Sequence, residues 1–113
     1  MDKLFLLKSQ FQDPQYPDRT FFCWHCALME GLLSLYPHLL QKLEIIRVEW
    51  PRPRVEVISE VGMENQSLPL LLLAKEKRSK YQTGIWQNRS FISDKDAILQ
   101  YLSEECGIPE IHP

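Results

Sequence analysis

The chain has 113 residues, of which 44% are hydrophobic and 25% charged, and its formal net charge is -2. This length supports one domain with one modest core, spanning residues 1–113, and the small net charge gives no indication of binding to nucleic acid or to an anionic membrane. The longest apolar run, Leu68–Ala74, is too short to cross a bilayer, and Met1–Lys8 lacks the features of a secretory signal. We therefore expect a cytoplasmic protein without a membrane partner.

Strand and helix patterns alternate in the first half of the chain. Lys3–Lys8 is a short apolar run typical of a buried strand, and the turn-forming residues of Ser9–Thr20 predict a long loop. Helical spacing of leucines begins at Cys26 and continues until Pro37, which can also begin a short second helix through Leu43. The β-branched residues of Glu44–Trp50 then predict a strand.

The second half of the chain shows strong signals for helix boundaries, because proline is favoured at the start of a helix and glycine just after its end. A leucine-rich run closed by charged residues predicts a buried strand. In order, we expect a helix from Pro53 that ends at Gly62, a strand from Leu70, a turn region at Gly84–Arg89, a strand at Arg89–Ile92, and a helix from Ser93 that ends at Gly107.

This element order, β-α-β-α-β-β-α, predicts an α/β domain with a four-stranded mixed sheet flanked by helices. The first two strands should be parallel, joined by a right-handed crossover, and the last two should form an antiparallel pair. Four segments should then converge on one edge of the sheet, where ligands of open α/β sheets bind. They are Cys23, Trp50–Arg54, Ser67–Pro69 and Ser93–Lys95.

Three separate motifs resemble the thioredoxin superfamily, in the form of glutaredoxins and the amino-terminal domain of glutathione transferases. Phe22–Cys26 is similar to the aromatic-Cys-x-x-Cys active site, and Ser67–Leu70 to the loop whose proline is cis. Asp94–Leu102 resembles an acid-Ser-x-Ala-Ile-x-x-Tyr-Leu motif of the transferases. More closely, the chain resembles a bacterial family of thioredoxin-like proteins of unknown function. The resemblance implies a thioredoxin-like fold, a cis Pro69, and a substrate that pairs with the backbone of Leu68.

Two departures from the transferase pattern affect the expected activity. Lys95 stands where the motif has a serine that holds a carboxylate of glutathione, although a lysine beside Asp94 can still pair with a carboxylate as a point charge. The chain also has no second helical domain, which a transferase needs for its hydrophobic substrate. Both departures argue against transferase activity.

The Cys-x-x-Cys motif has the residues that thiol–disulfide exchange requires. The reactive species is a thiolate, and the first turn of a helix favours negative charge on Cys23. A protonated His25 would stabilise this thiolate further, which makes such a pair a better oxidant. Cys26, one turn later, would resolve mixed disulfides, and Trp24 offers a contact surface for a partner. The third cysteine, Cys106, is expected to be a small buried hydrophobic residue.

We therefore predict a small thiol–disulfide oxidoreductase that acts on thiols or disulfides of proteins or of glutathione, as a monomer or homodimer. No bound cofactor is expected, and glutathione is a candidate co-substrate. Arg52 and Arg54 are candidates for binding a substrate carboxylate, with solvated loop arginines as the alternative. Two other functions remain open. One is a non-catalytic binding module with this fold, and the other is a metal or iron–sulfur carrier that uses the cysteine pair.

Overall fold

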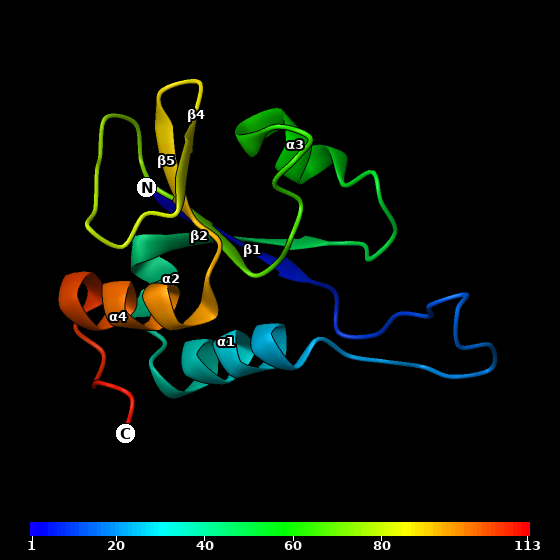
Figure 1. The fold of residues 1–113 in the computed structure, drawn as a ribbon. Coiled ribbons are helices and arrows are strands. Elements are labelled where there is room, and N and C mark those ends of the chain that lie inside the picture. The colour runs from blue at the N-terminus through cyan, green and yellow to red at the C-terminus, as the bar shows by residue number, and fades with distance from the viewer.

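The computed structural model describes all residues 1–113 and shows a mixed sheet with helices on both faces (Figure 1). The elements are β1 (Asp2–Leu7), α1 (Trp24–Leu35), α2 (Leu39–Lys42), β2 (Leu43–Val48), α3 (Val55–Val61), β3 (Leu70–Leu72), β4 (Gly84–Trp86), β5 (Arg89–Ile92) and α4 (Lys95–Cys106). The strands lie in the order β2-β1-β3-β5-β4. β1 and β2 are parallel, and all other neighbouring strands are antiparallel, which confirms the expected strand directions.

The sheet has five strands, so the prediction of four is wrong. The additional strand, β4, lies where the sequence indicates a turn, and it forms a hairpin with β5. The turn itself consists of Gln87 and Asn88, with φ angles of 45° and 66°, and such short turns match the twist of paired strands. Gly84 is needed for close packing, because a Cβ there would lie 2.4 Å from the ring of Phe91.

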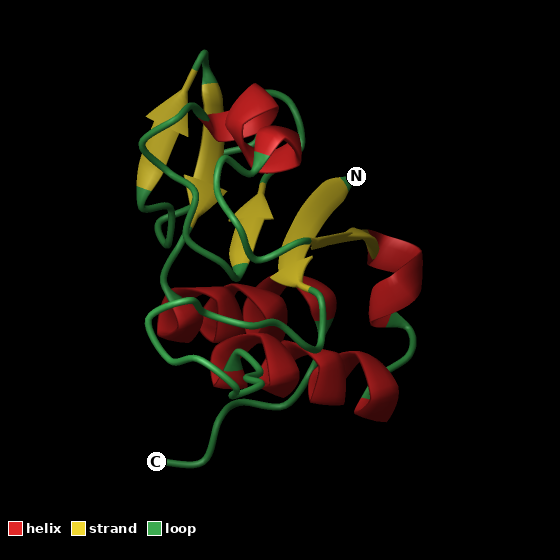
Figure 2. Ribbon diagram, turned by 90° about the vertical axis from the view of Figure 1, so that its right-hand side faces the viewer, coloured by secondary structure: helices red, strands yellow, loops and turns green.

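The alternation of side chains along the central strands divides the core into two clusters on opposite faces of the sheet. Leu4 and Leu6 of β1 pack with α1 and α4 in the larger cluster, whereas Phe5 packs with α3 in the smaller one. Figures 1 and 2 show α3 on one side of the sheet and the two long helices on the other. All three residues of β3 are fully buried, as expected for a central strand covered on both faces.

The helix ends follow the signals in the sequence. α1 ends just before Pro37, Gly62 follows α3 with φ 85°, and Gly107 follows α4 with a left-handed backbone. α1 begins at Trp24, earlier than the leucine spacing predicts, because the side chain of Cys23 caps it. None of the helices combines the length and the hydropathy needed to span a bilayer.

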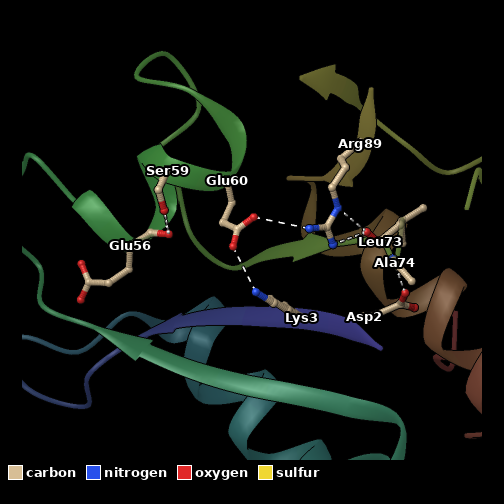
Figure 3. Close-up of polar contacts among 8 residues, drawn as sticks. All are labelled: Asp2, Lys3, Glu56, Ser59, Glu60, Leu73, Ala74 and Arg89. Carbon is tan, nitrogen blue, oxygen red and sulfur yellow. Dashed lines mark hydrogen bonds and ion pairs between the residues drawn. The ribbon is translucent and has the colours of Figure 1, made fainter. Parts of the chain in front are cut away.

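Polar contacts attach α3 to the sheet. Glu60 of α3 accepts hydrogen bonds from Lys3 of β1 at 3.0 Å and from Arg89 of β5 at 3.4 Å (Figure 3). Arg89 also donates to the carbonyl of Leu73 at 2.8 Å. These contacts fix α3 across the centre of the sheet, and with it the loops that precede and follow α3.

Candidate functional site

Cys23 and Cys26 lie at the carboxyl-terminal end of β1, where α1 begins. Cys23 is the residue before the first turn of α1, and its Sγ accepts a hydrogen bond from the backbone N–H of Cys26 at 3.3 Å. Cys26 is only 2% exposed, and its Sγ accepts from the backbone N–H of Leu7 at 3.4 Å. All three cysteines of the chain are free thiols. Cys106 is buried in the core, as predicted.

The two sulfurs differ in their surroundings. Burial, together with the contact with Cys23, raises the pKa of Cys26 to about 12, so this residue is a neutral thiol at physiological pH. Cys23 is half-buried and faces the free N–H groups at the start of α1, where negative charge is favoured. Cys26 is therefore the sulfur that keeps its proton, and Cys23 is the more accessible sulfur of the two.

A pocket of about 320 Å³ opens beside the two sulfurs. Its walls come from the end of β1, the following loop and the first turns of α1, and they are mostly apolar. The lining residues are Leu7, Lys8, Ser9, Phe22, Cys23, Cys26, Ala27 and Glu30. Both charged residues are paired outside the pocket: Lys8 binds Glu49 at 2.8 Å, and Glu30 binds Arg47 through two hydrogen bonds of 2.8 Å. The pocket can therefore receive an apolar group next to the sulfurs.

The start of α4 meets the start of α1 at Trp24, whose side chain is largely exposed. Lys95 Nζ lies 5.4 Å from the centroid of the indole ring, and the imidazole of His25 packs against the same ring with centroids 3.8 Å apart. The carboxylate of Asp94 instead accepts from the backbone N–H of Ala97 at 3.0 Å. Trp24, His25 and Lys95 thus lie together, as predicted for site residues, whereas the side chain of Asp94 caps α4.

The loop before β3 lies at the same edge of the sheet, since Leu70 pairs with Phe5 near the end of β1. The Leu68–Pro69 peptide bond is cis, as the resemblance implies. Leu68 packs against both core clusters, while its backbone N–H and C=O form no hydrogen bonds within the chain. These two groups remain available to a ligand.

The two arginines after β2 occupy different environments. Arg52 is exposed, whereas Arg54 is buried and donates to the carbonyl of Trp50 through Nε at 2.9 Å and Nη2 at 2.7 Å. Arg54 Nη1 also donates to the carbonyl of Gln66 at 2.7 Å. The side-chain Oε1 of Gln66 in turn accepts a hydrogen bond from the backbone N–H of Arg54 at 2.9 Å. Gln66 carries no sequence signal that predicts this role.

The long loop 9–20 is closed at its base by Phe11 and Phe21, which exchange two backbone hydrogen bonds of 3.0 and 2.8 Å. The ring of Phe11 stacks on Trp50, with centroids 5.4 Å apart and an interplanar angle of 4°. Figure 1 shows the tip of the loop extending away from the sheet. The closed base thus anchors the segment that leads to Cys23.

No group of three or more histidine, cysteine, aspartate or glutamate side chains is placed to hold a metal ion.

A family model described as a protein of unknown function (DUF3088) matches residues 1–110, so the chain belongs to this family. No curated protein and no solved structure matches the chain.

Proposed function

We propose that this member of the DUF3088 family is a thiol–disulfide oxidoreductase with a thioredoxin-like fold, in which Cys23 attacks and Cys26 resolves. The observation that carries the proposal is the difference between the two sulfurs. Cys23 is accessible at a helix start beside a pocket, whereas Cys26 is buried one turn later as a neutral thiol. An attacking thiolate and a protected resolving thiol are the two parts that disulfide exchange requires.

The reaction would proceed in two exchanges. The Cys23 thiolate attacks one sulfur of a substrate disulfide, forms a mixed disulfide, and displaces the other substrate sulfur as a thiolate. Cys26 then loses its proton to solvent or to the departing thiolate and attacks Cys23 Sγ. This step forms the Cys23–Cys26 disulfide and releases the second substrate sulfur. The substrate gains two electrons and the cysteine pair loses them, so the balance requires no further cofactor.

Two features of the fold support the thioredoxin-like assignment. The first is the parallel pair of β1 and β2 joined through α1, with the cysteines at the carboxyl end of β1. The second is the antiparallel arrangement of β3 between β1 and β5, followed by α4. In this account β4 is an addition at the edge beyond β5.

The surroundings of Cys23 suit a peptide-like disulfide, either in a protein or in glutathione. The free N–H and C=O of Leu68 can pair with an extended backbone, as in strand addition. Lys95 lies over Trp24 and can attract a carboxylate, although it also pairs with Asp96 at 2.9 Å. We further place this activity in the cytoplasm, where reduced thiols such as these three free cysteines persist.

The proposal is tested by assaying the reduction of hydroxyethyl disulfide with glutathione, glutathione reductase and NADPH, and of insulin with dithiothreitol. The wild-type protein should accelerate at least one of these reactions, and Cys23→Ser should abolish the acceleration because it removes the attacking sulfur. Cys106→Ser, which removes the third thiol, is the control and should remain active. Wild-type rates equal to the uncatalysed rates in both assays would refute the proposal.

A further inference from the structure

Arg54 is the only lysine or arginine among the buried residues of the chain, with 5% of its surface exposed. It forms no ion pair with a carboxylate, whereas the cations that do form such pairs are all more exposed. A buried charge without an opposite charge is costly. The position of Arg54 is therefore one at which a neighbouring negative charge would be stabilised.

The hydrogen-bond partners of Arg54 are neutral. Its guanidinium donates to the backbone carbonyls of Trp50 and Gln66, in the loops that precede and follow α3. These bonds hold the guanidinium in place and leave some of its N–H groups free, but they do not neutralise the charge. The guanidinium of Arg54 is therefore held in place while some of its N–H groups have no acceptor in the chain.

The cysteine pair lies at the same edge of the sheet as this cation. Cys26 Sγ is bound to the N–H of Leu7, Leu7 pairs with Val48 across β1 and β2, and Trp50 follows two residues later. Burial is the main cause that lowers the pKa of Arg54, followed by the nearby charge of Arg52, whereas Cys26 and Cys23 act in the opposite direction. The geometric link is Trp50: its carbonyl accepts from Arg54, and its side chain packs against the same core cluster as Cys23.

The other charged groups around the sulfurs already have partners. The ion pairs at this edge are Lys8–Glu49, Arg47–Glu30 and Lys95–Asp96. His25 packs against Trp24, and Arg52 is exposed to solvent. Arg54 is thus the buried cation that remains uncompensated when the reduced pair carries a negative charge.

We propose that Arg54 is the charge partner of the reduced cysteine pair, a positioning residue that stabilises the negative charge on Cys23. The inference deepens the proposed function and rests on it for the assignment of the thiolate to Cys23. When the pair is oxidised to a disulfide, the two sulfurs carry no charge and the electrostatic stabilisation is lost. Arg54 would therefore favour the reduced form selectively and make the pair a stronger oxidant.

The first test compares Arg54→Met, which removes the charge, with Arg54→Lys, which keeps it. The control is Arg78→Met, because Arg78 is an exposed arginine whose guanidinium binds Asn88 in the turn between β4 and β5. Alkylation of Cys23 by iodoacetamide at mildly acidic pH, followed by peptide mass spectrometry, measures the thiolate fraction. We expect Arg54→Met to slow this reaction about tenfold and to shift the glutathione redox equilibrium about tenfold toward the disulfide. Arg54→Lys should restore most of the rate, and Arg78→Met should match the wild type. A folded Arg54→Met with wild-type rate and equilibrium would overturn the inference.

A second measurement uses the wild-type Arg54 and tests the charge pairing even if Arg54→Met does not fold. The Nε–Hε resonance of Arg54 in the reduced wild-type protein should titrate together with the alkylation rate of Cys23. In the oxidised protein and in Cys23→Ser, the same resonance should stay constant over this pH range. A resonance that does not move in the reduced protein would contradict the charge pairing. If the protein shows disulfide reductase activity while this resonance stays fixed, the inference alone fails; absence of activity is a failure of the proposed function.

Discussion

The two ends of β1 differ in how completely their polar groups are paired. At the amino-terminal end, the buried carboxylate of Asp2 accepts from the N–H of Ala74 at 2.7 Å and from the hydroxyl of Tyr101 at 2.5 Å. Lys77 Nζ adds an ion pair with Asp2 at 3.4 Å. Figure 3 shows the contact with Ala74. The carboxylate of Asp2 is thus fully paired, and it ties β1, the end of β3 and α4 together.

The carboxyl-terminal end of β1 is left incomplete. A half-buried sulfur on Cys23 lies beside an open pocket, and the buried guanidinium of Arg54 has no carboxylate. Large apolar side chains, Phe22 and Trp24, remain 65% and 64% exposed on either side of Cys23. The amino-terminal end, called the closed end below, is therefore the place where polar contacts hold the fold together. The carboxyl-terminal end, called the open end, leaves a thiol, a pocket and apolar side chains accessible.

The largest expected effect concerns the open end. In Cys26→Ser the resolving thiol is gone, so the mixed disulfide between Cys23 and a substrate sulfur should accumulate, whereas in Cys23→Ser it should not form at all. Intact-protein mass spectrometry after incubation with oxidised glutathione measures the adduct. Equal adducts in both variants would contradict the assigned roles.

Replacing the carboxylate at the closed end should cost stability without changing reactivity. Asp2→Ala leaves the hydroxyl of Tyr101 and the N–H of Ala74 without their acceptor, and we expect a loss of about 3 kcal/mol in unfolding free energy. Urea unfolding measures the loss. The control Lys77→Met removes a more exposed partner and should cost less than about 1 kcal/mol. A slower alkylation of Cys23 in folded Asp2→Ala would show that Asp2 also affects the reactivity of Cys23 at the other end of β1.

The buried thiol at the open end predicts a loss of stability in alkali. Folded Cys26 keeps its proton up to a pKa of about 12, above the ordinary value of 9.0. Between these values the unfolded state binds fewer protons, so the unfolding free energy falls as pH rises, by up to about 1.4 kcal/mol per pH unit. Cys26→Ala should show a shallower decline in urea unfolding under reducing conditions. Identical slopes for the two proteins would show that Cys26 is not protected from ionisation.

The smallest effect is expected at an exposed ion pair beside the pocket. Arg47 and Glu30 form two hydrogen bonds, which hold the pKa of Glu30 below its usual range, but half of the Arg47 side chain is exposed. Arg47→Gln should therefore lower the unfolding free energy by about 0.5 kcal/mol. A loss above about 2 kcal/mol in urea unfolding would mean that paired charges at the open end stabilise the fold as strongly as those around Asp2.

The sequence predicts the elements of this fold where apolar spacing and helix ends coincide. The β1 run, the leucines of β3 and the α4 segment between Asp94 and Gly107 all carry such signals, and all form as expected. β4 is missed because Gly84 reads as a turn residue until its contact with Phe91 is known. A contact between residues on neighbouring strands cannot be predicted from the local spacing of apolar residues.

In the candidate site, too, local sequence pattern predicts some features, and contacts between distant segments decide others. Cys23 and Cys26 are identified by spacing alone, and the edge at which they meet the Leu68–Pro69 loop follows from the strand order. The burial of Arg54 is not predictable, because Arg52 and Arg54 both follow a proline and carry the same side chain. The hydrogen bonds that Arg54 forms with Trp50, four residues before it, and with Gln66, twelve residues after it, accompany its burial.

The proposed disulfide exchange is tested by the redox equilibrium of the cysteine pair in glutathione buffers, read by thiol trapping and mass spectrometry. We predict a two-electron transition between the dithiol and an intramolecular Cys23–Cys26 disulfide, which Cys106→Ser preserves and Cys23→Ser abolishes. If Cys23 and Cys26 form no intramolecular disulfide at any ratio of oxidised to reduced glutathione, they do not act together in disulfide exchange.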